Sequence, residues 1–236
     1  MKRLLPIFFL TVAICAAQPD TFKTTAGELK ITPVKHGTVL LQIAGKSWYV
    51  DPWSQADYST LPKADVILIT DIHGDHMDPK AIAQIAKDST VIVAPKAVAA
   101  TVKEAKVIGN GEKTTVDGVE IEAVPMYNLN RGPEAGKLYH DKGRGNGYVL
   151  NVGGKRIYFS GDTEVTDEMK ALKNIDVAYI CMNLPYTMPP DEAAAGVKAF
   201  RPKVVYPYHF RGSDLAVFES TLKSENGIEV RIRNWY

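Results

Sequence analysis

The chain has 236 residues, enough for one large domain or two small ones. Hydrophobic residues make up 45% of it and charged residues 23%, which is typical of a globular protein and excludes the disordered, collagen-like and coiled-coil classes. With 28 Lys and Arg against 27 Asp and Glu, the formal net charge is +1, so no general positive field exists to attract nucleic acid or anionic lipid. We therefore expect a small-molecule substrate held by local chemistry, and no nucleic-acid partner.

The first 17 residues have the pattern of a secretory signal peptide. Lys2 and Arg3 precede an apolar run over residues 4–17, which is too short for a comfortable membrane span. Small residues at its end predict cleavage before Gln18. Residues 18–236 would then form a single exported domain, periplasmic or extracellular, with no stable membrane anchor.

The cysteines leave one alternative open. A lipoprotein signal would make Cys15 the lipidated residue, but the bulky Ile14 stands where such signals carry a small residue. Cleavage before residue 18 leaves Cys181 as the only cysteine, so the mature chain would have no internal disulfide. Because Cys181 ends an apolar run, we expect it to be a buried structural thiol.

Apolar and β-branched runs predict strands that alternate with short helices. The expected strands lie at residues 31–50 (a meander), 65–70, 90–94, 114–125 (a hairpin), 148–152, 156–159, 176–181 and 203–208. The expected helices lie at residues 79–86, 96–104, 166–172, 191–200 and 214–223. Residues 126–146 form a long loop, and loops of that length in a compact domain are usually functional. This order predicts an α+β fold in which sheets pack on each other with helices outside.

The densest group of metal-ligating side chains follows directly after the strand at residues 65–70. Four potential ligands lie within six positions: Asp71, His73, Asp75 and His76. In a loop at a strand end, carboxylates and imidazoles so spaced can converge on one point, as a metal site requires. The alternative is a polar loop that caps the next helix, and four clustered ligand types make it the weaker interpretation.

This group resembles the His-x-His-x-Asp-His signature of the metallo-β-lactamase-fold hydrolases. Further elements follow in that family's order at residues 36–39 (His-Gly-Thr-Val), 50–52 (Val-Asp-Pro), 124–128 (Val-Pro-Met-Tyr-Asn), 160–163 (Ser-Gly-Asp-Thr) and 206–209 (Tyr-Pro-Tyr-His). These motifs are most similar to those of the branch that contains ascorbate-6-phosphate lactonase and N-acyl-phosphatidylethanolamine phospholipase D-like proteins. The resemblance implies a four-layer αββα sandwich and a metal-dependent hydrolase.

The resemblance also implies two metal sites that share a bridging carboxylate. The second site would be complete, and its implied ligands are Asp75, His76, Asp162 and His209. Two departures affect the first site, because Asp71 and Asn128 stand where the family has histidines. Its remaining ligands would be Asp71, His73 and Asp162, with Asn128 as a further candidate.

These departures bear on the metal. One or two divalent ions are expected, with zinc at the second site, whereas the oxygen donors of the first favour manganese, iron or magnesium. His140, in the long loop, could replace the missing nitrogen, although an exposed loop histidine is the alternative.

Other residues have supporting interpretations. His36 and Asp51 are expected to orient ligands, with ordinary strand-end packing equally open. Arg211 could hold an anionic substrate group, whereas we expect the charge of Arg144 to be solvated. Tyr208 could line the pocket or donate a proton, with packing as the alternative.

The resulting hypothesis is an exported hydrolase in which a metal-bound hydroxide, hydrogen-bonded to Asp75 or Asp71, attacks an ester, lactone, amide or phosphodiester. The family hosts several of these reactions, so the resemblance indicates only the reaction class. The alternative is a secreted metal-binding protein whose degraded first site is not catalytic. Nucleic-acid processing is disfavoured by the neutral charge.

Overall fold

The first sheet uses the N-terminal half of the chain in the computed structural model, which describes residues 19–236. Its strands, in spatial order, are β1 (Asp20–Thr24), β2 (Gly27–Lys35), β3 (Thr38–Ile43), β4 (Lys46–Val50), β5 (Val66–Leu68), β6 (Val91–Ala94) and β7 (Lys106–Val107). Strands β1 to β4 pair antiparallel and β4 to β7 pair parallel. Helix α1 (Pro79–Ile85) connects β5 to β6, and α2 (Lys96–Ala99) connects β6 to β7, because parallel strands need a crossover connection.

The second sheet repeats this arrangement. Its strands are β8 (Lys113–Val116), β9 (Val119–Met126), β10 (Gly145–Val152), β11 (Lys155–Phe159), β12 (Val177–Cys181), β13 (Val204–Tyr208) and β14 (Glu229–Val230). Strands β8 to β11 are antiparallel and β11 to β14 are parallel. Helices α3 (Asp167–Lys170), α4 (Pro190–Phe200) and α5 (Leu215–Leu222) belong to this half. The two halves therefore share one topology.

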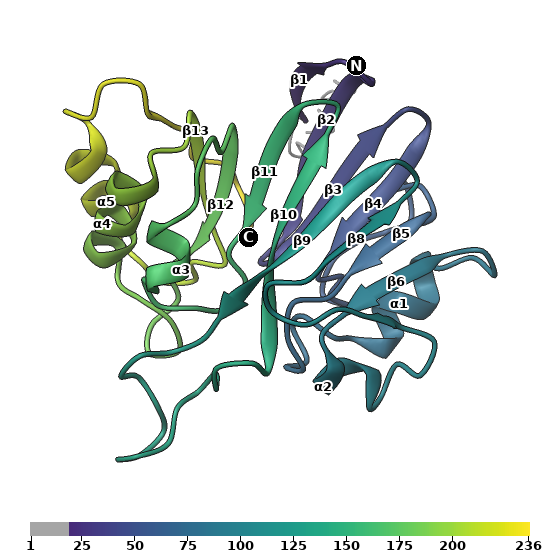
Figure 1. The fold of residues 1–236 in the computed structure, drawn as a ribbon, viewed down its shortest axis with the longest axis horizontal. Coiled ribbons are helices and arrows are strands. Elements are labelled where there is room, and N and C mark those ends of the chain that lie inside the picture. The colour runs from purple at the N-terminus through teal and green to yellow at the C-terminus, as the bar shows by residue number, and fades with distance from the viewer. Residues whose placement is uncertain (1–18) are drawn as a thin grey trace, which may run out of the picture.

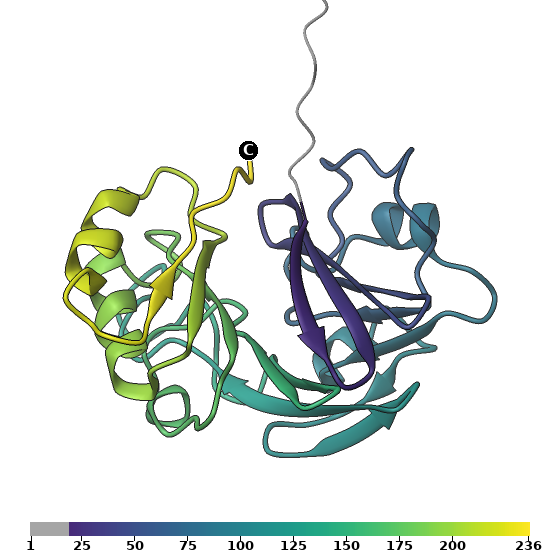
Figure 2. The same ribbon diagram turned by 90° about the horizontal axis from the view of Figure 1, so that it is seen from above.

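The layers confirm the predicted αββα sandwich. Helices α3, α4 and α5 lie on the outer flank of the second sheet, and α1 and α2 lie beside the first (Figures 1 and 2). The main core lies between the sheets and includes Leu41, Val50, Leu150 and Phe159, all at most 2% exposed. Parallel strands are buried on both faces, which explains why their sequences are almost wholly apolar.

Most predicted elements are confirmed, and two predicted helices are wrong in length. Asp78 caps α1, because its side chain accepts hydrogen bonds from the amides of Lys80 and Ala81. The helix predicted at residues 96–104 ends at Ala99, and the one predicted at 166–172 is the single turn α3. Strands β1, β7 and β14 were not predicted, since these short edge strands carry little apolar alternation.

The predicted signal peptide, residues 1–17, lies outside the described residues. Within residues 19–236, no helix combines the length and the apolar character needed to span a membrane.

Candidate metal centre

All six residues predicted as metal ligands meet at one edge of the two sheets. The 71–76 loop follows β5, Asp162 follows β11, and His209 follows β13. His140, from the long loop between β9 and β10, joins them. The ligand atoms form three groups, within each of which they lie inside 4.8 Å of one another, and the first and third share His209: His36, Asp75 and His209; Asp71, His73 and His140; and His76, Asp162 and His209.

Asp162 lies between the two halves of this cluster. The first half contains Asp71, His73 and His140, and the second contains Asp75, His76 and His209. On one side its carboxylate is 3.3 Å from His76 Nε2 and 3.3 Å from His209 Nδ1. On the other side it is 3.4 Å from His140 Nε2. One carboxylate therefore faces both halves, as the resemblance implied for a bridging ligand.

The first half contains two imidazoles. His73 Nδ1 lies 3.0 Å from Asp71 Oδ2, and His140 Nε2 lies 3.9 Å from the same oxygen. With Asp162, this half offers two nitrogen and two oxygen donors. The second half, made of Asp75, His76, Asp162 and His209, offers the same numbers of each, so the two halves match in donor type.

Four buried atoms in the cluster show that these residues fit metal ions. Among residues 19–236, no hydrogen-bond partner exists for His76 Nε2, His140 Nε2, His209 Nδ1 or Asp162 Oδ1. A buried polar atom without a partner costs about 1–3 kcal/mol. All four point into the cluster, and divalent cations would satisfy them together.

The charge of the cluster also favours cations. It contains the carboxylates of Asp51, Asp71, Asp75 and Asp162. Arg144 is the one arginine that pairs with them, so these carboxylates and Arg144 together carry 4 − 1 = 3 negative charges before the imidazoles are counted. Burial alone would lower the pKa of His76, but the neighbouring carboxylates raise it well above its ordinary value. Divalent cations held by these residues would balance this negative charge.

Asp51 contacts His76, one of the predicted ligands. Asp51 Oδ2 lies 2.8 Å from His76 Nδ1, and the amide and hydroxyl of Thr70 donate to the two Asp51 oxygens at 2.8 and 2.6 Å. His76 Nδ1–H donates to this carboxylate, which leaves Nε2 free to face Asp162. Such carboxylate–histidine pairs fix the tautomer of metal-binding histidines.

Asn128, a candidate ligand, instead holds His140. Its Oδ1 accepts hydrogen bonds from His140 N at 2.8 Å and from His140 Nδ1 at 2.7 Å. Its Nδ2 donates to Glu164 Oε1 at 3.0 Å and to the carbonyl of Tyr186 at 2.9 Å. Both lone pairs of Oδ1 are therefore in use, and His140 is left with Nε2 directed into the cluster.

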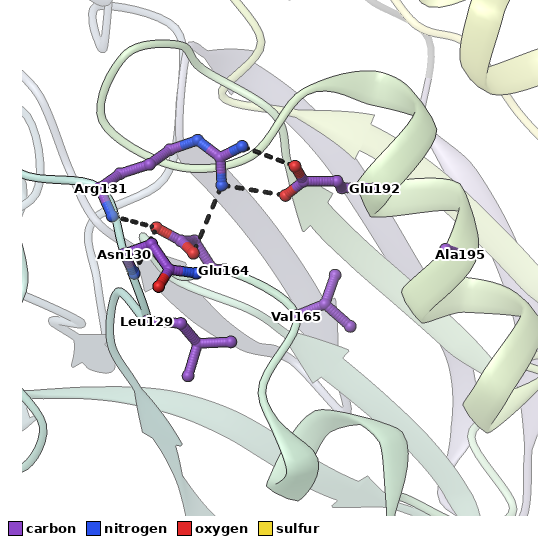
Figure 3. Close-up of a pocket in the computed structure, with 7 residues that line it drawn as sticks. All are labelled: Leu129, Asn130, Arg131, Glu164, Val165, Glu192 and Ala195. Carbon is purple, nitrogen blue, oxygen red and sulfur yellow. Dashed lines mark hydrogen bonds and ion pairs between the residues drawn. The ribbon is translucent and has the colours of Figure 1, made fainter.

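Glu164 anchors the long loop between β9 and β10. Its Oε1 also accepts from the amide of Arg131 at 2.8 Å, and Arg131 in turn forms a bidentate pair with Glu192 of α4 at 2.9 and 2.6 Å. Figure 3 shows this bridge beside a cavity of about 390 Å³. Two carboxylates compensate the one guanidinium, so the arrangement serves to attach the loop to the helix.

The expectation of a solvated charge at Arg144 is wrong. Its Nε and Nη2 donate to the two oxygens of Asp71 at 3.0 and 2.8 Å, and the Asp71 side chain is completely buried. Burial alone would raise the pKa of Asp71, but the hydrogen bond from His73 and the positive charges of His76 and Arg144 lower it to about 2. Asp71 is thus a charged group with its own counterion.

His36 contacts Asp75, another predicted ligand. Its Nδ1 lies 2.7 Å from the hydroxyl of Tyr236, and its Nε2 lies 3.1 Å from Asp75 Oδ2, which is also 3.1 Å from His209 Nε2. Burial is the main cause that lowers the pKa of His36 to about 4, so its ring is neutral near pH 7. The tyrosine hydroxyl donates to Nδ1, which leaves Nε2–H to fix Asp75.

Unusual backbone angles occur at this edge. His36, Asp51 and His209 are not glycines, yet their φ angles are 56°, 45° and 48°. Such conformations cost about 1–3 kcal/mol each and persist where the surroundings require them. At Gly37 a Cβ would lie 3.3 Å from the His209 ring, so the missing side chain allows this close approach.

Tyr208 lies behind the site. It is 1% exposed, its hydroxyl accepts a hydrogen bond from the amide of Gly161 at 2.9 Å, and burial raises its pKa well above the ordinary value. It therefore positions the turn that carries Asp162. Cys181 is a buried free thiol, as predicted.

A cavity of about 650 Å³ opens over the cluster. It is lined by His36, Trp53, His73, Asp75, Tyr139, His140, Asp162, Asn183, Leu184, Pro185, Tyr186, His209 and Arg211. The sequence reasoning missed Trp53, Tyr236 and Glu164. Glu164 directly follows the Ser-Gly-Asp-Thr element and Trp53 directly follows the Val-Asp-Pro element, so each adjoins a motif that is visible in the sequence, whereas Tyr236 has no such signal.

The fold and the site together define a class. Two mixed sheets with outer helices and a His/Asp cluster at their edge are the arrangement of the metallo-β-lactamase superfamily, and residues 30–209 match the family described as "Beta-lactamase superfamily domain". A metallo-β-lactamase superfamily protein from Thermotoga maritima shares the fold, with a TM-score of 0.61 at 21% identity over 86% of this chain and 97% of its own.

Similar proteins show to which family within this superfamily the chain belongs. The chain is 31% identical to a UPF0173 metal-dependent hydrolase of Symbiobacterium thermophilum over 84% of this chain and 89% of that protein. It is 29% identical to one of Pelotomaculum thermopropionicum, over 86% and 96%. The crystal structure of a candidate metal-dependent hydrolase from Parabacteroides distasonis is 45% identical, with a TM-score of 0.87 over 92% and 98%. The chain belongs to the UPF0173 metal-dependent hydrolases of the metallo-β-lactamase superfamily.

Proposed function

We propose that this hydrolase holds two divalent ions on either side of Asp162 and cleaves an ester, lactone, amide or phosphodiester bond of a small molecule. The observation that carries the proposal is a set of buried ligand atoms without hydrogen-bond partners among residues 19–236: Oδ1 of that carboxylate, and three histidine nitrogens that lie on both sides of it. The proposed second-site ligands are Asp75, His76, Asp162 and His209. The proposed first-site ligands are Asp71, His73, His140 and Asp162.

The donor sets bear on the metal. Each proposed site has two imidazoles and two carboxylates, a set that suits zinc, iron or manganese. We propose zinc at the second site. The first site binds more weakly in this proposal, because Arg144 already pairs with Asp71 and the His73 side chain is 43% exposed. His140 supplies the nitrogen that the non-catalytic alternative assumed to be missing.

The positions of the side chains around the cluster indicate which of them act in hydrolysis. Divalent ions in these sites would act as Lewis acids on the scissile group and lower the pKa of a water molecule to about 7. Asp75 is better placed than Asp71 to hold the attacking water, because its side chain is 30% exposed to the cavity whereas both oxygens of Asp71 accept from Arg144. His36 and His209 bind Asp75 Oδ2, which leaves Oδ1 as the acceptor.

Metal analysis combined with turnover tests this function. Purified protein is assayed for zinc, manganese and iron, and for hydrolysis of generic ester, lactone, amide and phosphodiester substrates with and without a chelator. Asp162→Ala should lose bound metal and activity together, whereas Asp88→Ala, an exposed aspartate, should keep both. Retention of metal and activity by Asp162→Ala would show that the site is misassigned.

Two finer points belong to the proposal. The order of the motifs supports the branch that contains ascorbate-6-phosphate lactonase and N-acyl-phosphatidylethanolamine phospholipase D-like proteins, so a phosphorylated lactone and a glycerophosphodiester belong in the substrate panel. The pattern of residues 1–17 supports export, with a mature N-terminus at Gln18. N-terminal sequencing of the exported protein tests it, and intact Met1 in the cytoplasm would contradict it.

A further inference from the structure

Among the described residues, one arginine that lines the cavity over the metal cluster has no carboxylate partner. Seven arginines lie within residues 19–236, and six of them pair with a carboxylate within 4.0 Å: Arg131, Arg144, Arg156, Arg201, Arg231 and Arg233. Arg211 has no such partner among the described residues, although it lines the cavity only two positions after His209. Its guanidinium is therefore free to bind an anion from solution.

Two aromatic rings hold this cation in place. The guanidinium carbon of Arg211 lies 5.8 Å from the ring centre of Trp53 and 5.8 Å from that of Tyr236. Tyr236 is itself fixed, because its hydroxyl contacts His36 Nδ1 at 2.7 Å and accepts from the amide of Phe210 at 3.1 Å. Stacking on aromatic faces leaves the N–H groups of an arginine available for a bidentate contact with carboxylate or phosphate.

A different part of the lining is apolar. Tyr139, next to His140, packs edge to face on Tyr186 with ring centres 5.0 Å apart. Leu184 and Tyr186 also line the cavity and are 48% and 46% exposed, and exposed apolar surface in a groove commonly marks a ligand-binding site. The lining near the first half of the cluster thus suits an apolar group, and the lining near the second half suits an anion.

We propose that the substrate is an amphipathic small molecule in which a terminal carboxylate or phosphate binds Arg211 and an apolar group contacts Tyr139, Leu184 and Tyr186. This rests on the proposed hydrolytic function and specifies its substrate class. The hydrolysed bond lies between the two groups, above the cluster. Water adds its OH to the acyl or phosphoryl centre and its remaining proton to the leaving oxygen or nitrogen. The cavity volume is within the range of small-molecule sites.

Charge explains why Arg211 would determine specificity. The cluster beneath the cavity is rich in carboxylates, which repel an anionic substrate until metal ions neutralise them. A fixed cation at the rim gives the anionic end a binding position away from those carboxylates. Arg211 then acts mainly on substrate binding, because it contacts the end of the substrate and not the bond that breaks.

Matched esters test the proposal on the metal-loaded full-length protein. Three 4-nitrophenyl esters with acyl chains of equal length end in a methyl, a carboxylate or a phosphonate group. We expect Arg211→Gln to lower kcat/KM about 10-fold or more for one or both anionic esters, mainly through KM, and to leave the methyl ester within about twofold. Arg211→Lys should retain part of the preference. Lys103→Gln removes an exposed charge outside the cavity lining and should leave kcat/KM unchanged for all three esters.

Binding without turnover gives a second measurement. Isothermal titration calorimetry compares the binding of 4-phenylbutyrate with that of 4-phenylbutanol. Arg211→Gln should weaken the binding of 4-phenylbutyrate and leave the binding of 4-phenylbutanol unchanged. An equal loss on all three esters, or a wild-type preference for the methyl ester, overturns the proposal while the hydrolytic function stands. If the wild type cleaves no ester, ester hydrolysis fails and the calorimetry decides: equal binding of 4-phenylbutyrate by wild type and Arg211→Gln overturns the substrate class, and selective weakening supports it.

Discussion

Removing the side-chain amide of Asn128 should weaken metal binding at the first site without removing any proposed ligand. In Asn128→Leu, His140 loses the acceptor for its ring Nδ1–H at 2.7 Å and for its backbone N–H at 2.8 Å. His140 is completely buried, so water cannot replace that acceptor. Its ring is then free to rotate or to adopt the tautomer that protonates Nε2, and either change spoils the proposed ligand.

The magnitude follows from the two orphaned donors. Each buried unsatisfied group costs about 1–3 kcal/mol, so we expect metal-free Asn128→Leu to lose on the order of 3 kcal/mol of unfolding free energy. Loss of a partner that orients a metal ligand typically lowers metal affinity by about 10- to 100-fold. The loss should fall on the more weakly bound ion, because Asn128 contacts His140 and none of the second-site ligands.

A matched control separates these two effects. Asn146 is also 1% exposed, and its amide donates to the carbonyl of Ile108 at 2.9 Å and accepts from Asn110 at 2.7 Å. Asn146→Leu should therefore lose comparable stability in urea while keeping both metal affinities. Competition with a chromophoric zinc chelator gives the two dissociation constants for each variant. If Asn128→Leu binds both ions as tightly as the wild type, the proposed role of His140 is refuted.

Three further predictions concern other parts of the fold. Burial raises the pKa of Cys181 to about 12, so this thiol should resist a disulfide reagent at pH 8 in the native protein and react once urea unfolds it. Thr166→Ala removes the cap that accepts from the Met169 amide at 3.1 Å, and should cost about 1 kcal/mol in denaturant unfolding. Burial alone would raise the pKa of Asp176, but Lys203 and Lys155 lower it, so the stability deficit of Asp176→Asn at pH 7 should shrink as the pH falls below about 4; a constant deficit would contradict this.

The sequence by itself determined most strands, the start of most helices and the position of the metal cluster along the chain. These features depend on neighbouring residues: apolar runs for buried strands, Asp78 before Pro79 for a helix start, and Asp117-Gly118 for a hairpin turn, where both residues have positive φ. The 71–76 ligand cluster was recognisable for the same reason, since its members are close along the chain.

Only the tertiary structure decided which groups surround each ligand. Asp71 pairs with Arg144, 73 positions away, and His36 contacts Tyr236, 200 positions away. Asn128 and His140 could each have been the ligand by residue type, and the choice depends on which hydrogen bonds the folded loop can form. Such contacts leave no local pattern in the sequence, because burial and charge balance arise only when distant segments are packed together.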